Sequence, residues 1–114
     1  MDVQIKRGFL DVCVLAAIRH KDSYGYRIVR DMKPFFDISE STLYPILRRL
    51  EAAALLTVYT ARYGGRLRKY YRITPAGISR IEDFQREWKE ILTMYQFVTR
   101  EDEAGGAAHP TGEA

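Results

Sequence analysis

The glycine pair Gly64-Gly65 constrains the fold of this chain more than any other feature of its sequence. It separates two short stretches, residues 56–63 and 68–73, that are rich in β-branched and aromatic side chains. Such side chains favour extended backbone, and two adjacent glycines permit the positive φ angles of a tight turn. The sequence therefore predicts a β-hairpin, with Tyr71 and Ile73 pointing inward from its second strand.

Three helices are predicted before the hairpin. Residues 9–18 are apolar at every position except Asp11, and their leucine and alanine content favours a buried helix. Ser23 is a candidate N-cap for a second helix over residues 24–33, and Ser39 for a third over residues 39–54. Apolar side chains recur every three or four positions in the third helix, so we expect them to form a core. They are Leu43, Ile46, Leu47, Leu50 and Ala54.

A long helix is predicted after the hairpin, from Pro75 to about Val98, because a threonine followed by proline is a typical helix start. Its apolar stripe has a heptad-like spacing, through Ile81, Phe84, Trp88, Ile91, Tyr95 and Val98. This stripe either packs on the chain's own core or forms a subunit interface, and its large aromatic side chains favour the interface. Residues 101–114 have little to bury, so we expect a disordered tail there.

This order of elements predicts a mainly α-helical fold with a small β-hairpin, namely a winged helix-turn-helix with one long C-terminal dimerisation helix. The winged helix-turn-helix domain is expected over residues 1–74 and the dimerisation helix over residues 75–100. A chain of 114 residues leaves no room for a second sizeable domain.

Positive charge is concentrated in one segment of the chain. Residues 48–74 carry seven basic side chains against Glu51 alone, whereas the whole chain has a net charge of only +3. Such a segment is typical of a surface that binds a polyanion, although solvated arginines would give the same pattern. In a winged fold, a helix can enter the major groove of DNA while a cationic hairpin contacts an adjacent groove or the phosphates.

The candidate DNA contacts are polar, aromatic or cationic side chains on three elements. Tyr26 on the second helix either reaches a phosphate or is buried. The third helix supplies hydroxyl and guanidinium groups, as well as a proline that can shape a docking surface, and the hairpin tip supplies cations. The set is Tyr26, Ser41, Thr42, Tyr44, Pro45, Arg48, Arg49, Arg66, Arg68 and Lys69.

Other classes of protein fit the sequence less well. Cys13 is the only cysteine, and we find no signal peptide, so a cytoplasmic protein is expected. The longest apolar run, residues 12–18, is too short to cross a bilayer. No enzyme, metal site or cofactor is expected, because no catalytic or metal-binding group of residues is apparent. The alternative is a winged-helix module that binds proteins rather than DNA, against which the arginine-rich hairpin argues.

Three motifs of this sequence resemble the PadR family of bacterial transcriptional regulators. They are Ser23-Tyr24-Gly25-Tyr26, residues 41–51 (STLYPILRRLE), and Gly64-Gly65-Arg66 leading into residues 68–77 (RKYYRITPAG). The resemblance covers roughly residues 5–98, and the length is similar to that of the short members with one C-terminal helix. One departure lies before the hairpin, where members usually have a polar residue and a glycine but this chain has Ala52-Ala53-Ala54.

The resemblance implies a homodimer that binds a palindromic operator on double-stranded DNA, usually as a repressor. Many members release the DNA when a small molecule binds, and a phenolic or planar aromatic effector is expected here. The resemblance also implies that the last helix packs on the first helix of the other subunit, with a tryptophan that stacks on flat aromatic drugs. Trp88 lies in the corresponding stretch, and the alternative is that it only packs the interface. The residues expected at the effector and dimer interface are Phe9, Cys13, Ile81, Phe84, Trp88, Ile91 and Tyr95.

Overall fold

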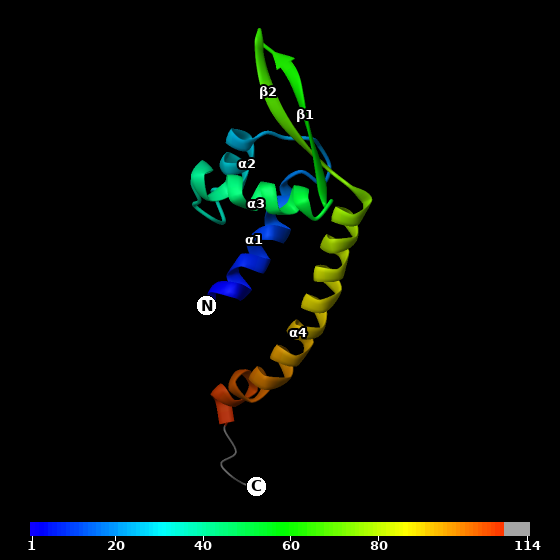
Figure 1. The fold of residues 1–114 in the computed structure, drawn as a ribbon. Coiled ribbons are helices and arrows are strands. Elements are labelled where there is room, and N and C mark those ends of the chain that lie inside the picture. The colour runs from blue at the N-terminus through cyan, green and yellow to red at the C-terminus, as the bar shows by residue number, and fades with distance from the viewer. Residues whose placement is uncertain (109–114) are drawn as a thin grey trace. The chain divides into compact units, whose positions relative to one another are not determined.

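The computed structural model describes residues 1–108 (Figure 1). The elements in chain order are α1 (Val3–Ala17), α2 (Gly25–Met32), α3 (Glu40–Ala52), β1 (Leu56–Tyr63), β2 (Arg66–Ile73) and α4 (Pro75–Ala108). The chain divides into two compact units, Met1–Glu82 and a second unit that begins at Asp83. The predicted fold class, mainly helical with one β-hairpin, is confirmed.

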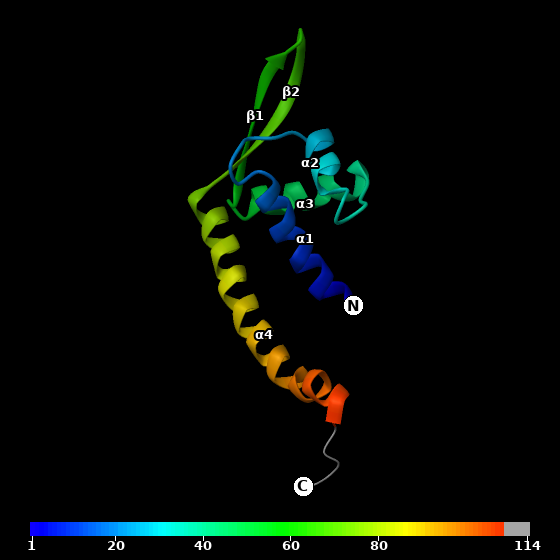
Figure 2. The same ribbon diagram turned by 180° about the vertical axis from the view of Figure 1, so that it is seen from behind.

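The core of the first unit lies among α1, α2 and α3, which pack against one another. Figures 1 and 2 both show α3 between α1 and the hairpin. The predicted stripe of α3 is buried from Leu43 to Leu50. Ala54 is an exception, because the helix ends at Ala52 and Ala54 is exposed with a φ of 61°. That left-handed conformation normally favours glycine, which is the residue that this chain lacks there.

The hairpin is a two-stranded antiparallel sheet in register from Leu56 opposite Ile73 to Tyr63 opposite Arg66. Gly64 and Gly65 have φ angles of 59° and 81°, as the predicted tight turn requires. The second strand begins two residues earlier than expected, at Arg66. Tyr71 is buried as predicted.

Ser23 is not the N-cap of α2, and that prediction is wrong. Its backbone pairs with β2 instead: the Ser23 N–H donates to the Tyr71 carbonyl at 3.2 Å and the Tyr71 N–H donates to the Ser23 carbonyl at 2.8 Å. Ser23 is only 2 % exposed, so these buried backbone groups need partners, and the neighbouring strand supplies them. The pairing ties the start of α2 to the base of the hairpin.

Helix α4 begins at Pro75 as predicted but extends to Ala108. Residues 101–108 are therefore helical, where a tail was expected from residue 101. Residues 109–114 of the expected tail lie outside the described residues. The boundary between the two units falls inside α4, so residues 75–82 belong with the winged helix-turn-helix. None of the helices within residues 1–108 is long and apolar enough to span a membrane.

Gly77, in the first turn of α4, packs tightly against Leu55, just before the hairpin, and Ile73 at its end. A Cβ atom at this position would meet the Leu55 carbonyl oxygen at 2.3 Å and Ile73 Cγ1 at 2.6 Å. Helix propensity alone would make Gly77→Ala stabilising by about 1 kcal/mol. The contact with fixed backbone outweighs this gain, so we expect destabilisation by about 1–3 kcal/mol in urea unfolding.

Gly8 in α1 is the matched control, because a Cβ added there would meet nothing within 4 Å. Gly8→Ala is expected to stabilise the protein by about 0.5–1 kcal/mol. Equal stabilisation by both substitutions would contradict the close packing at Gly77.

Candidate nucleic-acid interface

Ser41, Pro45 and Arg48 are exposed on the face of α3 opposite its buried stripe. Ser39 caps the helix as predicted, since its Oγ accepts a hydrogen bond from the Thr42 N–H at 3.2 Å. The same Oγ lies 2.8 Å from the Ser41 Oγ. Within the described part of the chain Arg48 makes no ion pair. The outer face of α3 therefore offers hydroxyl groups and one uncommitted guanidinium.

Arg49 does not lie on this outer face, which corrects its assignment as a DNA contact. Its guanidinium donates a hydrogen bond to the carboxylate of Asp11 on α1, and both side chains are largely removed from solvent. Because the two residues are 38 positions apart, the spacing along α3 gave no sign of this partner. Arg49 acts as a link between α1 and α3. Thr42 lies on the same side of α3 as Arg49. Pro45 lies at the border between this side and the outer face, and all three residues line a shallow pocket with the first turns of α1.

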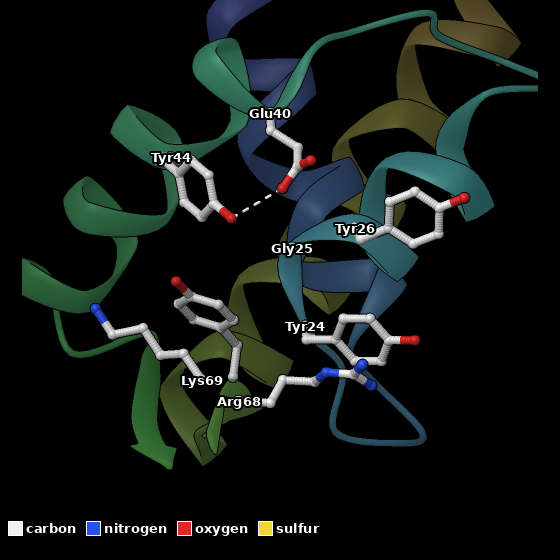
Figure 3. A pocket seen from close by; sticks show the side chains of 8 residues that line it. Tyr24, Gly25, Tyr26, Glu40, Tyr44, Arg68 and Lys69 are labelled. Atoms are coloured by element: carbon white, nitrogen blue, oxygen red, sulfur yellow. Dashed lines mark hydrogen bonds between the residues drawn. The ribbon is translucent and has the colours of Figure 1, made fainter. Parts of the chain in front are cut away.

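Tyr44 packs closely against the start of α2 (Figure 3). Its hydroxyl donates a hydrogen bond to Glu40 Oε1 at 2.9 Å, and a Cβ added to Gly25 would lie 2.7 Å from the Tyr44 hydroxyl oxygen. The absence of a side chain at Gly25 therefore permits a close contact between α2 and α3. Partial burial, followed by the hydrogen bond and the charge of Glu40, raises the pKa of Tyr44, so its phenol stays neutral at pH 7.

A pocket of about 370 Å³ lies among the start of α2, α3 and β2. It brings together four predicted site residues from three elements, namely Tyr26, Tyr44, Arg68 and Lys69. Tyr26 is largely exposed, so the alternative of a buried aromatic is wrong. The remaining lining residues are Tyr24, Gly25, Glu40 and Tyr71. This pocket, which we call the α2–β2 pocket, places cations of the hairpin beside the start of α2 and the first turns of α3.

The hairpin carries its cations on both faces. The strand register places Arg66 and Arg68 on one face and Lys69 on the other. Sequence reasoning missed the group that anchors the first face: the Tyr59 hydroxyl and Arg72 Nε donate to Asp22 Oδ2 at 2.6 and 3.0 Å. These residues are 37 and 50 positions from Asp22, so no local pattern could have found the group.

Replacing Asp22 with asparagine is expected to destabilise the protein at neutral pH. Partial burial raises the pKa of Asp22, but the hydrogen bonds from Tyr59 and Arg72 and the charge of Arg72 outweigh it and leave the pKa below its ordinary value. A lowered carboxyl pKa contributes stability above the unfolded pKa of about 3.9, and that stability is lost as the pH falls through the folded pKa. Urea unfolding should therefore separate wild type and Asp22→Asn at pH 7 and bring them together in acid. A difference that persists at the lowest pH would contradict this account.

The residues expected at a dimer interface fall into two groups. Phe9 and Cys13 on α1 are half-buried, and burial raises the pKa of the Cys13 thiol. Ile81 is only 4 % exposed and belongs to the core of the first unit, so its assignment to an interface is corrected. Within residues 1–108, no group of three or more histidine, cysteine, aspartate and glutamate side chains could hold a metal ion.

The other residues of the stripe lie in the second unit. The rings of Phe84 and Trp88 stack with centroids 6.0 Å apart and an interplanar angle of 6°. Trp88 is 44 % exposed, and Ile91 and Tyr95 are also exposed. This part of α4 therefore presents large apolar side chains at its surface.

The three-helix core, the polar face of α3 and the adjoining cationic hairpin define a winged helix-turn-helix DNA-binding protein. Residues 14–83 match the model of the transcriptional regulator PadR-like family, and the chain belongs to this family. It is a DNA-binding transcriptional regulator and not an enzyme.

Individual relatives agree with this assignment. The chain is 39 % identical over 102 residues to uncharacterized protein X of Lysinibacillus sphaericus, covering 80 % of this chain and 91 % of that protein. A Streptococcus transcriptional regulator of known crystal structure is 28 % identical, with a TM-score of 0.77 over 86 % of this chain and 99 % of the other. Bacillus subtilis PadR in complex with operator DNA is 26 % identical, with a TM-score of 0.63 over 68 % of this chain and 46 % of the other.

Proposed function

We propose that this regulator is a homodimeric repressor that binds a palindromic operator and leaves it when a planar aromatic effector binds. The observation that carries the DNA-binding part is the α2–β2 pocket, where two hairpin cations, Arg68 and Lys69, lie beside the start of α2 and the first turns of α3. The likeness to Bacillus subtilis PadR, whose structure contains operator DNA, supports DNA binding.

We assign base contacts to the outer face of α3, and phosphate contacts to the start of α2 and to the hairpin. Ser41 and Arg48 point away from the core at the positions from which a helix in the major groove reads base edges. Arg49 is committed to Asp11 and is left out of the contacts. The phosphate contacts are Tyr26, Arg66, Arg68 and Lys69.

The proposed dimer rests on the exposed apolar stripe of α4. Trp88, Ile91 and Tyr95 lie on one side of the helix and are exposed. Because exposure of a large apolar surface to water is unfavourable, we expect a second copy of the chain to bury these side chains. A two-fold axis would then present two copies of α3 to successive major grooves, with centres about 34 Å apart. This spacing makes a palindromic operator the natural target.

The proposed effector site is the ring pair of Phe84 and Trp88. Their parallel rings already form one half of a stack, to which a flat aromatic molecule can add. Release from DNA follows only if the effector binds more tightly to a dimer whose α3 helices are wrongly spaced. Quenching of Trp88 fluorescence by planar aromatic compounds tests this site, and unchanged ligand affinity in Trp88→Ala would assign Trp88 to interface packing alone.

Arg48→Ala is expected to lower operator affinity by about 1–3 kcal/mol if Arg48 reads a base. The measurement compares the operator with a duplex of scrambled sequence, and Arg30→Ala, at an exposed cation on α2, is the control. An equal loss on both duplexes would reassign Arg48 to the DNA backbone.

Selection of genomic fragments by the purified protein tests the proposal as a whole. We expect recovered fragments to share a palindrome with half-sites about one helical turn apart, upstream of a gene whose transcription the protein lowers. Fragments without a shared sequence would contradict the proposed operator, and a single half-site without symmetry would contradict the dimer.

A further inference from the structure

We propose that the α2–β2 pocket binds one phosphate group of the DNA backbone, and that Arg68 is its central ligand because two tyrosine rings hold its guanidinium in place. The inference rests on the proposed function and deepens it. The inference gives Arg68 a specific role in binding a phosphate, which Arg66 and Lys69 do not share.

Arg68 lies over aromatic rings from two parts of the chain, an arrangement that we call the sandwich. Its Cζ lies 4.0 Å from the ring centroid of Tyr24, before α2, and 4.9 Å from that of Tyr63, at the end of β1. Figure 3 shows the guanidinium of Arg68 beside the ring of Tyr24. A guanidinium that contacts aromatic rings in this way can still donate its N–H groups to a hydrogen-bonding partner. Arg68 is half-buried, in contrast to the exposed Arg66.

The sandwich leaves the charge of Arg68 without a counterion. Within the described part of the chain, no carboxylate lies at ion-pair distance from Arg68. A partly desolvated cation gains most from an anion that accepts two parallel hydrogen bonds, and a phosphate has the right shape for this. Because the rings already restrict the rotamers of Arg68, little further conformational entropy is lost when the phosphate binds.

The rest of the pocket supplies additional hydrogen-bond donors. Tyr71 is only 4 % exposed and lines the pocket, and its hydroxyl has no hydrogen-bond partner among residues 1–108. Among the described residues, every fully buried side-chain polar atom has a hydrogen-bond partner. The unpartnered Tyr71 hydroxyl is therefore not fully buried, and a ligand in the pocket can reach it. The side chain of Tyr24, at the N-cap of α2, makes no hydrogen bond to the helix.

The charges around the pocket favour an anion. Arg68 and Lys69 contribute two positive charges, and Glu40 contributes one negative charge. The carboxylate of Glu40 is occupied by the Tyr44 hydroxyl, which donates to it at 2.9 Å. Burial raises the pKa of both Tyr44 and Tyr71, so these two phenols carry no negative charge at pH 7.

The test compares Arg68→Lys with Arg66→Lys in binding to a duplex of fixed sequence. Both substitutions keep the charge, so both should keep the slope of log affinity against log salt. A lysine cannot fill the sandwich or make the paired hydrogen bonds, so Arg68→Lys should weaken binding about tenfold and Arg66→Lys no more than about twofold. Equal small losses for the two variants would overturn the inference.

A double-mutant cycle with Tyr63→Leu separates the sandwich from general packing. Tyr63 is exposed near the hairpin tip, so its loss should leave the fold intact, which thermal unfolding checks. We expect Tyr63→Leu to weaken duplex binding about threefold in the wild-type background and to have no effect in Arg68→Ala. Additive losses would overturn the sandwich.

Two further outcomes distinguish the inference from the function on which it rests. If the wild-type protein does not bind duplex DNA, the proposed function fails and the phosphate site fails with it. If wild type binds but Arg68→Lys binds equally well, only the phosphate site is overturned. Saturable shifts of the Tyr71 ring signals in NMR spectra with inorganic phosphate, together with unchanged DNA binding of Arg68→Lys, would assign the pocket to a free phosphate compound and overturn the assignment to DNA.

Discussion

Replacing Arg66, Arg68 and Lys69 together with alanine is expected to lower the affinity for duplex DNA by about two orders of magnitude at 0.15 M salt. Each phosphate that a cation neutralises adds about 0.9 to the slope of log affinity against log salt, because bound counterions are released. Three lost contacts should therefore reduce the slope by about 2.7. Titration of a labelled duplex by fluorescence anisotropy at several salt concentrations measures both quantities.

A matched control removes the same charge from a different surface. Lys21, Arg30 and Lys33 are exposed cations that lie outside the hairpin. Their joint replacement with alanine changes the net charge equally but should alter the slope by less than 1. Equal slopes for the hairpin variant and the wild type would remove the hairpin from the DNA-binding surface.

Introducing aspartate at both Ile91 and Tyr95 is expected to convert the dimer to a monomer and to weaken operator binding at least about 100-fold. Both side chains are exposed on α4, so the substitutions should leave the fold of the chain intact. Two charges placed at the centre of an apolar interface cannot be solvated when the subunits associate. The expected loss in affinity is large because a single subunit engages only one half-site.

Sedimentation velocity measures the dimer, and titration of the operator measures binding. Gln85→Asp combined with Gln96→Asp serves as the control, since these exposed residues lie on another side of α4. The control should sediment as wild type does. A dimer that persists with aspartate at residues 91 and 95 would assign the subunit interface to another surface.

The elements that sequence analysis predicted correctly carry strong local signals. Gly64 and Gly65 form the predicted turn, Ser39 caps α3, and α4 starts at Pro75. Each of these depends on backbone conformation or hydrogen bonds within a few residues, which is why sequence alone is sufficient.

The errors occur where distant parts of the chain compete with local preferences. Ser23 pairs with β2 rather than capping α2, and Arg49 pairs with Asp11 rather than facing outward. Ile81 continues a heptad-like stripe, yet its place at the start of α4 buries it in the first unit. The Tyr24–Arg68–Tyr63 sandwich could not have been predicted either, because it depends on the loop before α2 lying beside the hairpin.

The central claim is that the outer face of α3 and the cationic hairpin together bind the sugar–phosphate backbone and bases of duplex DNA. The most direct test is to measure binding of the purified wild-type chain to its selected operator and to a scrambled duplex over a range of salt concentrations. We predict a linear fall of log affinity with log salt for both duplexes and tighter binding to the operator at every salt concentration. No binding to either duplex at low salt, or binding that does not depend on salt, would contradict the account.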